Sequence, residues 1–169
     1  MRSEQRWSFL CDALDDVIES CGANKGNIQL VDRGGNLRIV ASFGFDGRFL
    51  DFFDVVHTEG TACGTALKLG QRVVVPDIAA SEIFAGTDAI EAMLSADCRA
   101  VQSTPLARDG KVFGVVSTHW RKRWVPRLVD SRALSAAIDA AAPLVWRAAM
   151  LENAMARPRQ AAVASSVCK

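Results

Sequence analysis

The chain has 169 residues, of which 50% are hydrophobic and 23% are charged, and its formal net charge is +1. This length and apolar content suit one globular domain with a sizeable core. The near balance of charge gives no general reason to bind nucleic acid, an acidic substrate or an anionic membrane.

The cysteines and the apolar runs limit the cellular setting. Five cysteines are an odd number, and none of them form a CxxC spacing. This argues against both a disulfide framework and a zinc site. The first residues lead into an amphipathic segment and not an apolar signal core. No run approaches the ~20 apolar residues that span a bilayer. We therefore expect a cytoplasmic protein with no membrane partner.

The predicted elements combine paired strands with separate helices. The first elements in chain order are a helix over 4–20 that ends at Gly22, strands over 26–32 and 37–43, and a short helix from Asp46 to Phe53. A helix that Thr61 caps and Gly70 stops, a strand over 72–75, and a loop and helix over 81–96 follow. The last elements are strands over 100–107 and 112–120 and a long helix over 126–155 that Pro143 should kink or restart. This order predicts an α+β fold with an antiparallel sheet. Residues 1–156 form one predicted domain, and the small, polar residues 157–169 a disordered tail.

The hairpin over 99–120 is the expected centre of the sheet. Asp109-Gly110 between two β-rich runs is a strong turn signal, because glycine accepts the positive φ that tight turns demand. Neither face of the hairpin is clearly polar, so both should be covered. Its polar residues must then be satisfied by protein, water or a ligand. These residues are Gln102, Ser103, Thr104, Ser117, Thr118 and His119.

The register of this hairpin decides which polar groups share a face. A two-residue turn pairs Gln102 with Ser117, whereas a three-residue turn with a glycine bulge puts Val101 there.

Four segments follow one another along the chain: GNIQLVD, LRIVASFGF, CGTALKLGQRVVVPDI and RAVQSTPLARDGKVFGVVSTH. In this order and spacing the chain resembles a GAF domain, the small sensory module attached to many bacterial signalling proteins, over about residues 5–155. The resemblance implies a five- or six-stranded antiparallel sheet with the N- and C-terminal helices on one face. On the other face, loops and short helices would enclose a small-molecule pocket.

The resemblance also implies which residues line that pocket. They are the segment 57–63 with His57 and Cys63 at its ends, then Asp77, Ile83, Phe84, Ser103, Ser117 and His119. The family pattern favours the bulged turn, and so Ser103 over Gln102. Asp77 could bond a ligand or cap the next segment, and Ile83 and Phe84 could form a lid or belong to the core. The two histidines could bind an anion, a metal or haem iron, but no carboxylate or thiolate stands at ligand spacing. We therefore favour structural histidines and identify no cofactor.

Cys63 is the main candidate for thiol chemistry. It stands at a predicted helix start, where the helix dipole would lower its pKa. TACGTA resembles the first redox cysteine of the free methionine-(R)-sulfoxide reductases, which have a GAF fold, and Cys98 would supply a partner thiol. That family holds its substrate with carboxylates on the central strands, which here carry Val101, Ser117 and His119. A small packed cysteine is the favoured interpretation.

The sequence thus predicts a non-catalytic sensory domain that binds a small molecule. It would signal through a homodimer of its terminal helices to a histidine kinase or another regulator, as in a two-component system. Trp146, Met150 and Leu151 are candidate dimer residues. Two alternatives stay open: a reductase-like thiol enzyme that uses Cys63 and Cys98, and a pure dimerisation module whose pocket is filled by its own side chains.

Overall fold

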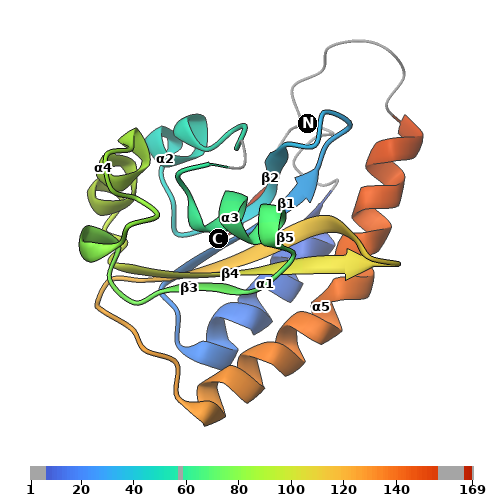
Figure 1. Cartoon of the computed structure of the whole chain (residues 1–169). Coiled ribbons are helices and arrows are strands. Elements are labelled where there is room, and N and C mark those ends of the chain that lie inside the picture. The colour runs from blue at the N-terminus through green and yellow to red at the C-terminus, as the bar shows by residue number, and fades with distance from the viewer. Residues whose placement is uncertain (1–6, 57–58, 156–165, 169) are drawn as a thin grey trace.

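A six-stranded sheet lies between two layers of helices, one on each of its faces (Figure 1). The computed structural model describes residues 7–56, 59–155 and 166–168. The elements are α1 (Ser8–Cys21), β1 (Lys25–Val31), β2 (Leu37–Phe43), α2 (Gly47–Phe52), α3 (Ala62–Leu69), β3 (Val73–Val75), the 3-10 helix η1 (Ile78–Ala80), α4 (Asp88–Ser95), β4 (Ala100–Arg108), β5 (Lys111–Trp120), α5 (Leu128–Met155) and β6 (Ser166–Cys168). The strand order is β3-β4-β5-β1-β2-β6, and the first five strands pair antiparallel. The predicted α+β class and central β4–β5 hairpin are confirmed.

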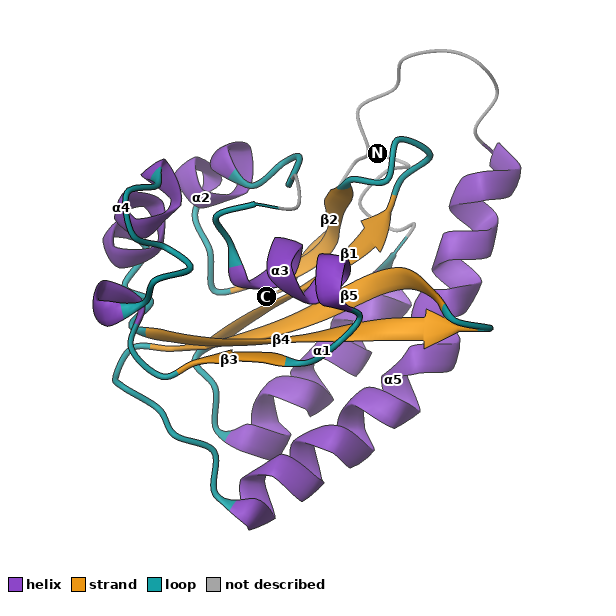
Figure 2. Cartoon of the chain, viewed as in Figure 1, coloured by secondary structure: helices purple, strands orange, loops and turns teal. Residues whose placement is uncertain are grey.

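Helices α1 and α5 cover one face of the sheet (Figure 2). On α1 the buried positions recur at three- and four-residue steps, as in Leu10, Leu14 and Val17. On α5 a matching stripe includes Leu134 and Val145, both fully buried. The two stripes form one core with the sheet, so most of the stability of both helices comes from this packing.

Two features of helix α5 bear on the expectations. It runs from Leu128 to Met155 as one helix with Pro143 inside it, so the proline does not restart the helix. Pro143 is exposed, away from the sheet. By length and composition alone α5 could also cross a membrane, with a mean hydropathy of 1.3 in its most apolar window. We expected no such segment. A helix that packs in the core of a globular domain passes the same test, and α5 does so here.

The register of β4 and β5 differs from both predicted registers. The turn has two residues, Asp109 and Gly110, which both have positive φ. A bulge lies farther along, at Leu106/Ala107. It shifts the pairing by one residue and sets Ser103 opposite Ser117. We expected the bulge in the turn, but it lies within the paired strands. The two-residue type I′ turn needs no bulge, because its backbone already matches the twist of the strands.

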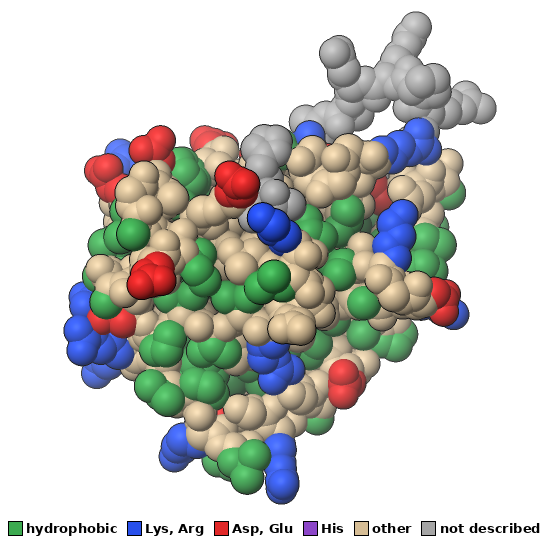
Figure 3. Space-filling view, viewed as in Figure 1, with side chains coloured by type: hydrophobic (Ala, Val, Ile, Leu, Met, Phe, Trp, Pro, Cys, Tyr) green, Lys and Arg blue, Asp and Glu red, His purple; other side chains and the backbone are tan. Residues whose placement is uncertain are grey.

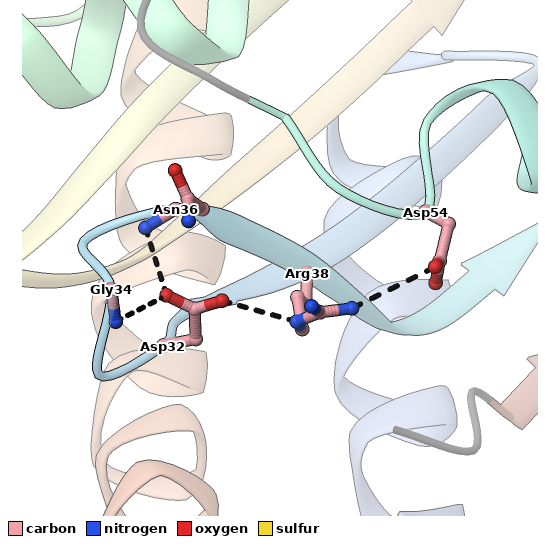
Figure 4. Close-up of polar contacts among 5 residues, drawn as sticks. All are labelled: Asp32, Gly34, Asn36, Arg38 and Asp54. Atoms are coloured by element: carbon pink, nitrogen blue, oxygen red, sulfur yellow. Dashed lines mark hydrogen bonds and ion pairs between the residues drawn. The ribbon is translucent and has the colours of Figure 1, made fainter. Parts of the chain in front are cut away.

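The β1–β2 turn is held by one carboxylate (Figure 4). Asp32 Oδ1 accepts hydrogen bonds from the backbone N–H of Gly34 at 2.8 Å and of Asn36 at 3.0 Å, and Oδ2 accepts one from Arg38 at 3.1 Å. Arg38 also pairs with Asp54 at 3.6 Å. Burial would raise the pKa of Asp32, but these donors hold it below its ordinary value.

Strand β6 corrects the prediction for the tail. Residues Ser166–Cys168 pair parallel with Ala41–Phe43 of β2. Three residues of the predicted disordered tail are therefore a strand, because they satisfy the backbone groups that β2 would otherwise expose at the edge of the sheet. The rest of the predicted tail, 157–165 and 169, lies outside the described residues.

The cysteines also need a correction. Cys11 on α1 is disulfide-bonded, whereas Cys21, Cys63 and Cys98 are free thiols. The odd count and the spacing argued against a disulfide framework, yet they could not exclude a single bond between residues far apart in the sequence.

The other face of the sheet carries the short helices α2, α3 and α4 (Figure 1). Two predicted caps fix where these helices begin. Asp46 accepts a hydrogen bond from the N–H of Phe49 at 3.1 Å, and Thr61 accepts one from Gly64 at 3.0 Å. This layer and the sheet enclose a second core cluster, and the candidate site lies within it.

Candidate functional site

A small pocket lies between the sheet and the layer of short helices. Its volume of about 20 Å³ is room for about one water molecule. The floor is formed by residues of β1, β4 and β5, and the walls and roof are mostly apolar. The lining residues are Asn27, Gln29, Phe49, Phe53, Thr61, Ala62, Cys63, Phe84, Met93, Val101, Ser103, Ser117 and His119.

The floor is a polar patch built by strand register. Asn27 pairs with Ser117, and Ser117 pairs with Ser103, so these three residues form a row across β1, β5 and β4. The Oγ atoms of the two serines are 2.8 Å apart and share a hydrogen bond. Gln29 and His119 each lie two residues from this row, so they project from the same face of the sheet. The structure therefore brings together three of the predicted site residues on the floor, Ser103, Ser117 and His119. Two more predicted residues, Cys63 and Phe84, line the same pocket.

Three atoms of this floor have no hydrogen-bond partner within the described part of the chain. They are Asn27 Oδ1, Gln29 Oε1 and His119 Nδ1. The three residues are only 4%, 1% and 3% exposed, respectively. A buried polar group left unpaired costs about 1–3 kcal/mol. Each atom therefore favours a water or a ligand in the pocket.

His119 is a neutral imidazole at pH 7. Burial, together with the neighbouring Lys25 ammonium, lowers its pKa to about 3. Lys25 does not line the pocket. Its Nζ donates to the carbonyl of Ala96 at 2.5 Å and lies 5.6 Å from the ring of Phe45. The Phe45 ring stands edge-on to His119, at 5.0 Å between centroids. Figure 3 agrees with this burial, because no described histidine reaches the surface on the face that it shows.

The histidines do not form a metal site in the part of the chain that the structure covers. Within it, no three His, Cys, Asp or Glu side chains are grouped to hold a metal ion. His57 was the other candidate and lies outside the described residues.

The thiols do not have the character expected of redox cysteines. Cys63 lines the pocket, and its sulfur donates to Thr61 Oγ1 at 3.5 Å. Burial raises its pKa even though its hydrogen bonds with Thr61 and Gln29 oppose the shift. The expected lowering by the helix dipole is therefore wrong, because loss of solvent outweighs it. Cys98 is 2% exposed, burial raises its pKa to about 12, and it does not line the pocket.

Asp77 does not belong to the pocket lining either. It begins η1, where Oδ1 accepts from the N–H of Ala79 at 3.2 Å. Arg99 donates to both of its oxygens, at 2.6 and 3.2 Å, and Arg123 pairs with Oδ2. The hydrogen bond from Arg99 is the main reason that the pKa of Asp77 is lowered. Of the two predicted roles, the structure supports the cap.

The two candidate lid residues, Ile83 and Phe84, line different cavities. Phe84 is 1% exposed and forms part of the pocket wall. Ile83 instead lines an open groove beside the pocket. Asn27 and Gln29 also belong to the floor, although the sequence pattern did not lead us to predict them as site residues. The available signal was two amide side chains at alternate positions of the otherwise apolar strand GNIQLV.

Aromatic rings separate the pocket from two surface grooves. Phe49 borders the pocket and also a groove of about 360 Å³ between α2 and α4. Phe53 and Thr61 border the pocket and also a groove of about 490 Å³ that Ile83 lines. The rings of Phe45, Phe49 and Phe53 follow one another at centroid distances of 3.8 and 4.5 Å. Movement of Phe49 or Phe53 would therefore widen the pocket toward these grooves.

An antiparallel sheet with terminal helices on one face and a pocket under short helices on the other defines a small α+β domain of the GAF type. A family model described as GAF domain matches residues 8–148, and the chain therefore belongs to the GAF domain family. GAF domains of this kind occur in sensor and signalling proteins. Among curated proteins, none matches this chain.

Solved structures share this fold at low sequence identity. A domain assigned to a two-component sensor histidine kinase of Sinorhizobium meliloti 1021 is 15% identical, with a TM-score of 0.70 over 88% of this chain and 96% of that one. The GAF domain of an Acinetobacter phosphoenolpyruvate-protein phosphotransferase is 16% identical, with a TM-score of 0.69 over 90% and 89%. The type II free methionine-R-sulfoxide reductase of Thermoplasma acidophilum is 17% identical, with a TM-score of 0.66 over 86% and 95%. At these identities the likeness shows the fold alone.

Proposed function

We propose that this GAF domain is a non-catalytic sensory module that binds a small molecule in the pocket and signals through its terminal helices. The observation that carries the proposal is the pocket floor, where Asn27, Gln29 and His119 each bury a polar atom without a partner among the described residues. A domain selected only for stability would favour apolar side chains at such positions. A ligand that supplies the missing hydrogen bonds explains them.

Entry to the pocket would use its aromatic roof. The floor lies on central strands of the sheet, whereas Phe49 belongs to the six-residue helix α2 and Phe53 follows it directly. A short helix over open grooves can move at lower cost than a central strand. A ligand would then select the conformation in which these rings have moved outward.

The floor strands also contact the terminal helices, which supports transmission of the signal. A Cβ built at Gly26 on β1 would lie 3.0 Å from Leu14 of α1. One built at Gly114 on β5 would lie 3.2 Å from Val145 of α5. The strands that carry Asn27 and Ser117 thus pack against both helices, so a shift of the floor would change the helix pair.

A homodimer through α5 belongs to the same proposal. Apolar side chains exposed on α5 are Leu128, Val129, Met150, Leu151 and Met155. Trp146, the remaining candidate dimer residue, also contacts Phe113 within the chain, at 5.0 Å between ring centroids. The partner would be a histidine kinase or another regulator in the cytoplasm.

Native mass spectrometry of the full chain as purified, before and after denaturation, tests the proposal. We expect a bound mass that is lost on denaturation, and a dimer in the same spectrum. Replacing both floor serines (Ser103→Val with Ser117→Val) should abolish the bound mass. Thr104→Val is the matched control, because Thr104 is a buried polar residue of the same strand that faces the helices. A bound mass that survives in the serine variant would contradict the proposed site.

A pure dimerisation module is the second candidate, and the pocket volume of about 20 Å³ favours it. In that case side chains and about one water would fill the pocket. The same spectra would then show a dimer with no bound mass, and the dimer would be equally stable in the serine variant.

A further inference from the structure

We propose that the ligand is a small uncharged molecule with at least one N–H or O–H donor, of the carboxamide or urea class. This inference rests on the proposed function and adds the chemical class of the ligand. It follows from three properties of the lining: its lack of charge, its balance of donors and acceptors, and its size.

The described lining residues include no Asp, Glu, Lys or Arg. His119, the one titratable nitrogen base among them, is neutral at pH 7. Lys25 pairs with His119 in the strand register, but it does not line the pocket and its Nζ donates to a backbone carbonyl. A carboxylate, phosphate or ammonium group in this pocket would lose its water without gaining a direct counter-ion, and an unpaired buried charge is strongly disfavoured.

The unpartnered atoms show what the ligand must offer. Asn27 Oδ1 and Gln29 Oε1 accept hydrogen bonds only, and His119 Nδ1 accepts in one neutral tautomer. The Ser103–Ser117 pair uses one of its two hydroxyl hydrogens internally and leaves the other to donate. The floor therefore complements a molecule with two or more donors beside one acceptor. Carboxamides and ureas have this pattern, and either amide side chain can turn to present its NH₂ group instead.

The size of the pocket points in the same direction. A cavity of about 20 Å³ admits few atoms before its roof must move. The aromatic and aliphatic walls, Phe49, Phe84, Met93 and Val101 among them, suit the carbon side of a small planar molecule.

Four planar probes with the same four-heavy-atom skeleton separate these properties: acetamide, acetate, acetamidinium and acetone. Acetamide is neutral with donors, acetate is an anion, acetamidinium is a cation, and acetone is neutral without donors. Each is titrated into the ¹⁵N-labelled full chain, and the backbone amides of Asn27 and Ser117 are followed. Ligands of this size bind weakly, so concentrations reach about 50 mM. We expect saturable shifts with acetamide and at least about tenfold weaker binding of the other three.

Two variants sharpen the test. Asn27→Asp puts a carboxylate into the floor and should switch the preference from acetamide to acetamidinium. If this variant does not fold, Ser117→Val is the alternative. It should lower the affinity for acetamide at least about fivefold, and acetate and acetamidinium should still not bind. Thr104→Val, on the opposite face, should bind acetamide like the wild type.

Acetate or acetamidinium that binds as tightly as acetamide would overturn the uncharged class but leave the pocket as a ligand site. Equal binding of acetone would overturn the need for donors. If no probe shifts the floor amides, the inference fails. In that case a bound mass in the native spectrum would still support the proposed function, and its absence would remove both.

Discussion

His119 makes the stability of this domain depend on pH. In the folded chain burial lowers its pKa from 6.5 to about 3. In the unfolded chain the imidazole is solvated and keeps its ordinary value. Between those two pH values the unfolded chain binds a proton that the folded chain does not. The free energy of unfolding should therefore fall as the pH falls from about 6.5 toward 3.

The size of this effect follows from the two pKa values. Each pH unit inside the window changes the free energy of unfolding by about 1.4 kcal/mol. Acidification from about pH 7.5 to about pH 5 crosses part of the window, and the linkage relation gives a loss of about 2 kcal/mol. This is a large fraction of the 5–15 kcal/mol typical of a domain.

Urea unfolding of the wild type and of His119→Gln measures the effect, because glutamine keeps a polar side chain but cannot take up the proton. Carboxylates titrate in both proteins and cancel in the difference. The stability advantage of the wild type should shrink by about 2 kcal/mol between about pH 7.5 and pH 5. Any contribution of the other histidine, His57, is present in both proteins and cancels in the same difference. Parallel pH profiles for the wild type and His119→Gln would refute the reasoning.

Three further predictions test the packing, the site boundary and the thiols. Gly114→Ala would place its Cβ 2.8 Å from a backbone oxygen of β1 and should lower the free energy of unfolding by about 2 kcal/mol. A Cβ at Gly47 meets nothing within 4 Å, so Gly47→Ala is the control and should not lower the stability. Equal melting temperatures of the two variants would contradict this. Asp77→Asn weakens the ion pairs with Arg99 and Arg123 but should leave acetamide binding unchanged. Weaker acetamide binding by this variant in the ¹⁵N titration would show that Asp77 contributes to the site. Because burial raises the pKa of Cys63 and Cys98, both should react with maleimide at least about tenfold more slowly in the folded than in the unfolded chain. Mass spectrometry of the labelled peptides measures these rates. Fast labelling of Cys63 in the folded chain would support the thiol-enzyme alternative.

Local chemistry was enough to predict the elements and their faces. The helix periodicity from Leu10 to Val17 and the caps at Asp46 and Thr61 act over a few residues, so the sequence displays them directly. The Asp109-Gly110 turn is local in the same way. These features account for the confirmed α+β class and the central hairpin.

Features that depend on distant pairing could not be predicted. The bulge at Leu106/Ala107 sets Ser103 opposite Ser117, yet nothing in those residues distinguishes a bulge in the strand from one in the turn. Strand β6 depends on segments far apart in the sequence, because residues 166–168 pair with 41–43. The same limit applies to the pocket floor. Asn27 faces the pocket only because β1 pairs with β5 in the observed register, and the helix dipole at Cys63 was outweighed by burial that only the fold creates.

The central claim is that this pocket is a binding site and not a filled core. A high-resolution crystal structure of the full chain as purified tests it most directly. We predict density larger than one water between Asn27, Ser117 and Phe84, with its polar atoms toward the sheet and with Phe49 or Phe53 displaced toward the surface grooves. A single water beneath rings that keep the positions described above, in a pocket of about 20 Å³, would contradict the claim.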